Sequence, residues 1–155
     1  MRNPAQQVIE KLSSDNQFDL KTVSAFTAPD FREGVQWLVQ NEKHELAQAL
    51  AEAGLALYPL SEDLLAISGL LAMTRKDWPL AIELLEDLVT VQKDRIQPVT
   101  CQMLARSLAC NLDITEAFQV LNQALNVWPG DALLESEKQS LSAFYNIAPG
   151  SEASN

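Results

Sequence analysis

The chain has 155 residues, of which 11 are Lys or Arg and 21 are Asp or Glu, so its formal net charge is −10. Hydrophobic residues make up 47% and charged residues 21%, a balance typical of a soluble globular domain, and the length suits one domain. The acidic balance and the scattered basic residues exclude a non-specific nucleic-acid binder, because phosphate neutralisation requires clustered Lys and Arg.

Residue types favour helices over sheets. Leu (24) and Ala (19) outnumber Val and Ile, which together reach 15, and the β-branched residues are the strand formers. No stretch approaches the roughly 20 apolar residues that a membrane helix requires, and no secretory signal is expected at the start of the chain. The two cysteines, Cys101 and Cys110, are predicted to share one helix about 13.5 Å apart, beyond disulfide reach. We therefore expect a reduced, cytoplasmic protein without membrane insertion.

Residues 1–27 are predicted to form an N-terminal helical segment. Apolar residues recur at helical spacing over residues 4–13 and again over residues 17–26. The sequence therefore predicts two short helices before the rest of the fold.

Three segments, 28–61, 62–95 and 98–131, share one pattern. Each contains two blocks of apolar residues at helical spacing, separated by three or four polar residues. Ala47, Ala81 and Ala117 align between the segments and lie 34 and 36 residues apart, and two extra residues precede Pro98. Small side chains at such positions let paired helices approach closely, so we expect three helix pairs.

Helix starts are predicted at three of the expected positions. Asp30 with Glu33, and Asp113 with Glu116, have the D-x-x-E spacing of a capping box, and Ser61 precedes an acidic first turn.

After the third segment, residues 132–147 are predicted to form a capping helix that begins after Gly130-Asp131. Leu134, Leu141 and Tyr145 are expected to pack on the preceding helix pair. Four polar residues of the same helix are expected to face water: Glu135, Glu137, Lys138 and Gln139. Residues 148–155 are predicted to be a disordered tail.

The three segments resemble the tetratricopeptide repeat (TPR) family, whose unit is a 34-residue antiparallel helix pair. The third segment matches the family's pattern of apolar, small and proline positions best, with Leu104, Ala105, Leu108, Ala117, Leu121, Ala124 and Pro129. The tryptophan common early in the unit is absent and is replaced by Phe31, Leu65 and Cys101. The resemblance implies an all-α fold, an α-solenoid of three TPR-like helix pairs with N-terminal helices and a C-terminal capping helix.

The same resemblance implies a concave groove lined by the first helix of each pair. Its residues in this chain would be Arg32, Gln36, Val39, Ala66, Leu70, Met73, Val99, Gln102, Arg106 and Ala109. An apolar centre with polar flanks suits an extended or helical peptide that carries apolar anchors. A clamp for a C-terminal carboxylate is not expected, because Ala66, Leu70 and Val99 occupy much of the surface that such a clamp uses.

The residues offer no support for catalysis, a cofactor or a metal. His44 is the only histidine and is expected to be a turn or packing residue, since no second histidine completes a metal set. Cys110 has no partner base and is interpreted as a small apolar side chain. The acidic residues Glu83, Glu86 and Asp87 are interpreted as the solvated face of a helix. Three tryptophans, Trp37, Trp78 and Trp128, are expected to pack at helix ends, with an exposed binding hot spot as the alternative.

The sequence therefore predicts a non-enzymatic protein-interaction module that binds a partner peptide in its groove, as an adaptor or chaperone. In length, acidity and repeat plan the chain is similar to the TPR-type chaperones of bacterial type III secretion. The alternative is a structural subunit that self-associates through its convex face or N-terminal helices, which would allow a homodimer.

Overall fold

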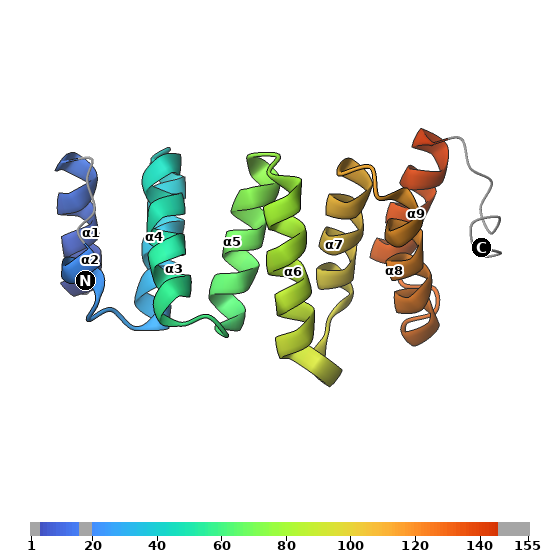
Figure 1. The fold of residues 1–155 in the computed structure, drawn as a ribbon, viewed down its shortest axis with the longest axis horizontal. Coiled ribbons are helices and arrows are strands. Elements are labelled where there is room, and N and C mark those ends of the chain that lie inside the picture. The colour runs from blue at the N-terminus through green and yellow to red at the C-terminus, as the bar shows by residue number, and fades with distance from the viewer. Residues whose placement is uncertain (1–3, 16–19, 146–155) are drawn as a thin grey trace. The chain divides into compact units, whose positions relative to one another are not determined.

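In a computed structural model of the protein, which describes residues 4–15 and 20–145, these residues form helices and turns and contain no strand (Figure 1). In chain order the helices are α1 (Pro4–Asp15), α2 (Leu20–Val23), α3 (Ala28–Gln40), α4 (His44–Leu57), α5 (Glu62–Thr74), α6 (Trp78–Gln92), the 3₁₀ helix η1 (Lys93–Arg95), α7 (Pro98–Cys110), α8 (Ile114–Val127) and α9 (Ala132–Phe144). The all-α fold class predicted from the sequence is confirmed. The predicted tail lies outside the described residues.

The chain divides into two compact units, residues 1–71 and 72–155, with the boundary inside α5. In the first unit, α3 packs against α1 and α4. Six large side chains of this unit are completely buried: Ile9, Phe31, Val35, Leu38, Leu50 and Leu64. Glycine permits this packing at two places, because a Cβ at Gly34 would overlap Ile9 Cδ1 and one at Gly54 would lie 2.9 Å from Phe31 Cγ.

The N-terminal helices follow the prediction only in part. The helix expected over residues 4–13 is present as α1. The second helix, expected to reach residue 26, ends at Val23 in the structure, so its predicted extent is wrong. The chain turns there: the Phe26 N–H donates to the Val23 carbonyl (3.0 Å), and Thr27 then caps α3.

Two of the expected helix starts differ from the prediction. The capping box of α3 joins Thr27 to Asp30, with the Asp30 N–H donating to Thr27 Oγ1 (3.2 Å) and the Thr27 N–H to Asp30 Oδ2 (2.9 Å). Asp113 precedes α8 but makes no side-chain cap, because its carboxylate accepts from Asn111 Nδ2 (2.9 Å). Ser61 caps α5 as its position indicated, accepting from the Leu64 N–H (3.3 Å).

The turn between α3 and α4 has the same hydrogen bonds as the turns after α5 and α7. In the first turn the Lys43 N–H donates to the Leu38 carbonyl (2.8 Å) and the Glu42 N–H to the Val39 carbonyl (3.0 Å). The N–H groups of residues 77 and 76 make the same two bonds after α5, and those of residues 113 and 112 make them after α7. This pair of bonds defines the Schellman motif. The central residues Glu42, Lys76 and Leu112 all have a positive φ (59°, 61° and 70°). Their spacing of 34 and 36 residues equals that of the aligned alanines, so the local backbone repeats with the sequence.

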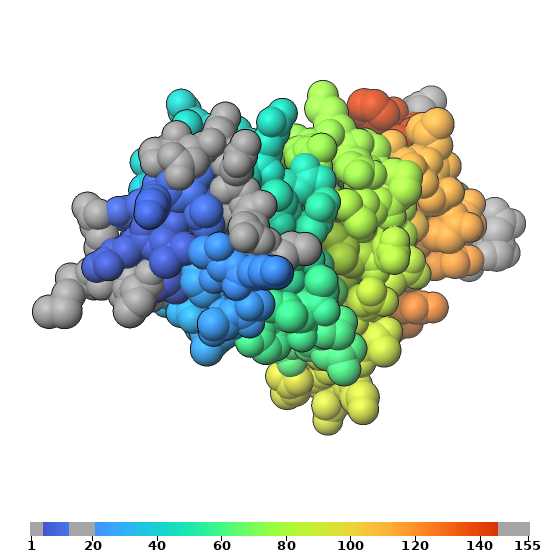
Figure 2. Space-filling model, turned by 60° about the vertical axis from the view of Figure 1, so that its left-hand side comes forward, coloured from blue at the N-terminus to red at the C-terminus, as the bar shows by residue number. Residues whose placement is uncertain are grey.

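In the second unit, α6, α7, α8 and α9 run alternately up and down in Figure 1. Helix α7 packs against α6, α8 and α9, and α9 also packs on α8. Completely buried residues come from all four helices: Ala81, Leu85, Ala105, Ala117, Leu121 and Leu134. The additional residues before Pro98 lie in the connection that contains the exposed η1, which projects beyond the end of α6 (Figures 1 and 2).

Candidate protein-binding surfaces

The described residues contain no group of three or more His, Cys, Asp or Glu side chains that could hold a metal ion. Within the same residues, no helix is long and apolar enough to cross a membrane. His44 is exposed at the first residue of α4, which agrees with a turn position and not with a packed one.

The predicted groove residues of the first unit lie on α3 and α5. Leu70, in the interior of α5, is 53% exposed. Gln36 is exposed, while Arg32, Val39 and Ala66 are half-buried. Arg32 Nη2 lies 3.8 Å from Glu33 Oε1, and its buried Nε has no hydrogen-bond partner among the described residues. The five residues thus supply one exposed apolar side chain and polar groups.

In the second unit, the predicted groove residues lie at the end of α5 and along α7. Val99 is 45% exposed and Met73 is half-buried. Ala109 is buried (3% exposed), so the expectation that it lines an accessible groove is wrong. Tyr145, directly after α9, lies against this residue, because its hydroxyl donates to the Ala109 carbonyl (3.0 Å).

The two polar groove residues of α7 contact Glu137 of α9. Arg106 Nη2 donates to Glu137 Oε1 (2.6 Å) and Arg106 Nε to Oε2 (3.4 Å), while Gln102 Nε2 donates to Oε1 (3.2 Å). Glu137 is only 5% exposed, whereas the Arg106 side chain is 53% exposed. The expectation that Glu137 faces water is therefore wrong. The hydrogen bond to Glu137 raises the pKa of Arg106 above its ordinary value.

Both cysteines are free thiols on α7. Partial desolvation raises the pKa of the Cys110 thiol and outweighs the nearby Arg106, which acts in the opposite direction; Glu137 adds to the increase. Burial also raises the pKa of Cys101. A nucleophilic cysteine requires the thiolate to be stabilised, so neither thiol has the electrostatic environment of an activated nucleophile.

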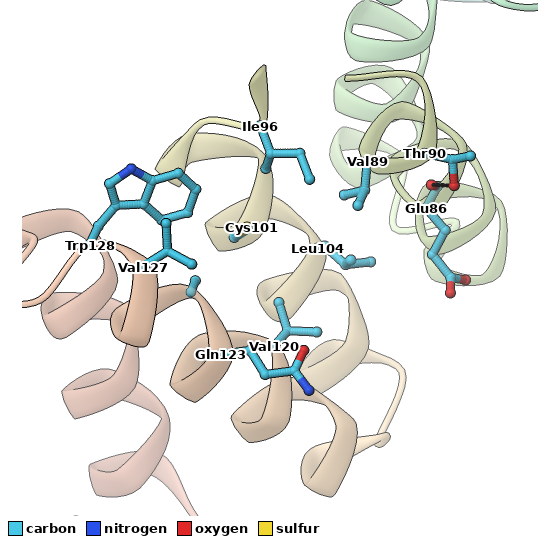
Figure 3. Close-up of a pocket in the computed structure, with 11 residues that line it drawn as sticks. Glu86, Val89, Thr90, Ile96, Cys101, Leu104, Val120, Gln123, Val127 and Trp128 are labelled. Atoms are coloured by element: carbon cyan, nitrogen blue, oxygen red, sulfur yellow. Dashed lines mark hydrogen bonds between the residues drawn. The ribbon is translucent and has the colours of Figure 1, made fainter. Parts of the chain in front are cut away.

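A groove that the sequence did not predict lies in the second unit, between α6 and α8 with α7 as its floor (Figure 3). We call it the α6–α8 groove. Its volume is about 420 Å³, and it is lined by Glu86, Val89, Thr90, Ile96, Cys101, Leu104, Val120, Gln123, Ala124, Val127 and Trp128. Trp128 and Cys101 therefore lie at a cavity and are both only half-buried. The signal in the sequence was the apolar set Val120, Val127 and Trp128 along the second helix of a pair.

The walls of the α6–α8 groove are mainly apolar. Val127 is 66% exposed at the α8 wall, and Leu104 of the floor is 7% exposed. The Thr90 hydroxyl is already bonded, because it donates to the Glu86 carbonyl (3.0 Å; dashed line in Figure 3). The other polar side-chain groups of the lining are the Glu86 carboxylate, the Gln123 amide, the Trp128 indole and the weakly polar Cys101 thiol.

The repeated antiparallel helices and their shared turns define a class, the TPR-like helical-repeat proteins, and the fold is an α-solenoid of TPR-like helix pairs. A similar solved structure is that of a candidate kinesin light chain from Podosopora anserina with nearly identical TPR-like repeats. The TM-score is 0.65 at 17% identity, and the match covers 95% of this chain and 88% of that one. At this identity the likeness concerns the fold alone. No protein-family model and no curated protein matches the sequence.

Proposed function

We propose that the protein is a non-enzymatic protein-interaction module whose first helices, α3, α5 and α7, bind a peptide of a partner protein. The main supporting observation is Leu70, which is 53% exposed on α5. When a partner covers a leucine that retains half of its surface in water, the burial favours binding by about 1 kcal/mol. In the second unit, Val99 of α7 is 45% exposed and offers an apolar position of its own.

Polar contacts are available beside Val99. Arg106 uses Nε and Nη2 to bind Glu137, but its side chain remains 53% exposed. A guanidinium carries five N–H donors, so Arg106 can still donate to a peptide carbonyl or carboxylate from its exposed edge. Gln102, which donates to the same carboxylate, retains its amide oxygen as an acceptor.

Two narrower forms of the proposal follow from the sequence. One is a cytoplasmic adaptor or chaperone, including a chaperone of a bacterial secretion system, and it is supported by the acidic charge and the repeat plan. The other is a structural subunit that self-associates, and sedimentation velocity over a range of concentrations separates the two. A partner-binding module stays monomeric, whereas a structural subunit gains mass as its concentration rises.

The proposal is tested by selecting peptides from a phage-displayed library on the wild-type protein and measuring their affinity for two variants. Leu70→Glu introduces a charge where an apolar anchor would bind and should weaken binding about tenfold or more. Leu60→Glu is the matched control, because Leu60 is 72% exposed in the loop before α5 and belongs to no predicted groove. Full affinity of the Leu70→Glu protein, folded by circular dichroism, would contradict the proposal.

A further inference from the structure

We propose that the α6–α8 groove is a second docking site, and that its ligand is a basic amphipathic helix of a partner protein. This site is separate from the proposed peptide-binding residues on the first helices. The groove lies entirely within the second unit, whereas Leu70, the residue that mainly supports the first proposal, belongs to the first unit. The two proposals can therefore fail independently.

Apolar contact would supply most of the affinity. Val89 of α6, Leu104 of α7 and Val120 of α8 face one cavity from three helices (Figure 3). Val127 extends the α8 wall and is 66% exposed, so a ligand would remove much apolar surface from water there. The cavity of about 420 Å³ is within the range of volumes of specific ligand sites.

The lining also decides the conformation of the ligand. An extended peptide needs partners for its backbone N–H and C=O groups, and leaving them unpaired against an apolar wall is costly. The lining elements are helices, which bond their own backbone groups internally, and the Thr90 hydroxyl already donates to a carbonyl of α6. Few polar groups remain for an extended chain. A helix satisfies its backbone within itself and inserts apolar side chains spaced at i, i+3, i+4 and i+7.

The charge of the α6 wall indicates that the polar edge of this helix is basic. Glu86 lines the groove, and Glu83 and Asp87 are exposed on the same helix. Among the described residues, none of these three carboxylates has an ion pair or a side-chain hydrogen bond. No Lys or Arg lines the groove. A Lys or Arg beside the apolar stripe of the ligand would therefore find an unpaired carboxylate at the rim.

The binding test uses the full chain and a fluorescein-labelled synthetic helix with a Leu stripe and flanking Lys residues. Val127→Asn should weaken binding about fivefold because it removes apolar contact. Its matched control is Leu112→Asn, which also replaces an exposed aliphatic residue with Asn but lies in the turn before α8, outside the groove. Glu86→Lys should weaken binding about three- to tenfold, and Glu116→Lys, with the same change in net charge on α8, should have little effect.

A thiol footprint locates the bound peptide. In a Cys110→Ser variant, Cys101 is the remaining thiol and lines the groove, so saturating peptide should slow its alkylation by N-ethylmaleimide several-fold. In a Cys101→Ser variant the exposed Cys110, outside the groove, should react at an unchanged rate. A peptide in which Glu replaces every Lys should bind more weakly and protect Cys101 less.

Several results would overturn the inference. One is equal affinity of the Leu/Lys peptide for the wild type, Val127→Asn and Glu86→Lys; another is binding without protection of Cys101. Tighter binding of the Glu-containing peptide would contradict the basic partner. Self-association that Val127→Asn abolishes would assign the groove to a second copy of the chain. Loss of binding in Leu70→Glu but not in Val127→Asn would place the peptide on the first helices.

Discussion

Replacing Arg106 should destabilise the protein more than replacing Glu137, although the two residues form one ion pair. The difference follows from their environments: Glu137 is 5% exposed, and the Arg106 side chain is 53% exposed. Arg106→Met leaves a buried carboxylate whose remaining partner is Gln102 at 3.2 Å. Removing one partner of a buried pair costs about 3–5 kcal/mol, and because Gln102 stays we expect about 3 kcal/mol.

Replacing Glu137 instead of Arg106 leaves the positive charge of Arg106 without its partner. Glu137→Met removes the buried carboxylate, and the guanidinium that remains is already half in water. The cost should be that of the lost hydrogen bonds, about 1 kcal/mol. The double variant buries two apolar side chains where the ion pair was, and such replacements are often close to neutral. Because the single changes cost about 3 and about 1 kcal/mol, the double variant should be about 4 kcal/mol more stable than their sum implies.

Urea unfolding of the four proteins, followed by circular dichroism, gives the free energies of this cycle. Hydrogen exchange read by mass spectrometry assigns the change to α7 and α9, which carry the two residues and pack together. Arg106→Lys is the matched control. It keeps the positive charge of the solvent-exposed partner and should therefore recover part of the stability. Equal costs for Arg106→Met and Glu137→Met, or strict additivity in the double variant, would refute the reasoning.

Three further predictions concern packing, a turn and the thiols. Gly54→Ala should destabilise the protein by about 1–2 kcal/mol, because its Cβ would lie 2.9 Å from Phe31 Cγ in the core. A higher melting temperature would mean that helix propensity outweighs the overlap. Leu112→Asn should stabilise it by about 1 kcal/mol in urea unfolding, since Leu112 has a φ of 70° and is 77% exposed. Alkylation of Cys101 and Cys110 should rise with pH through midpoints above the ordinary thiol value, because a raised pKa leaves less thiolate at any given pH. A midpoint below that value for either single-cysteine variant would contradict the assigned desolvation.

The helices were predictable because their signal is local and repeated. Ala47, Ala81 and Ala117 are all completely buried, as expected for small residues where paired helices approach. Residues near one another in the sequence determine such periodicity, and three copies in one phase reinforce it. The Schellman turns were not predicted, because their left-handed residues are Glu42, Lys76 and Leu112 instead of glycine.

The burial of Glu137 on α9 could have been predicted from the sequence, but its partner could not. Glu137 lies three residues after Leu134 and four before Leu141, so it falls on the apolar stripe of that helix. Its charge suggested the solvated face, and its partner Arg106 stands 31 residues earlier in the chain. A pair so distant is determined by tertiary packing and not by local pattern. The α6–α8 groove was missed for the same reason, since three helices contribute its walls and floor.

Helix α7 presents different faces to its surroundings. Gln102 and Arg106, spaced i and i+4, face Glu137 of α9, whereas Cys101 and Leu104 form the floor of the α6–α8 groove. A ligand on either face adds contacts to a helix that already packs on α6, α8 and α9, so it stabilises the second unit. Coupling between the faces would require α7 to have two arrangements with different affinities, and a well-packed helix supplies no second arrangement by itself. A peptide on the first helices and a basic helix in the α6–α8 groove should therefore bind independently, which lets one chain hold two proteins at once.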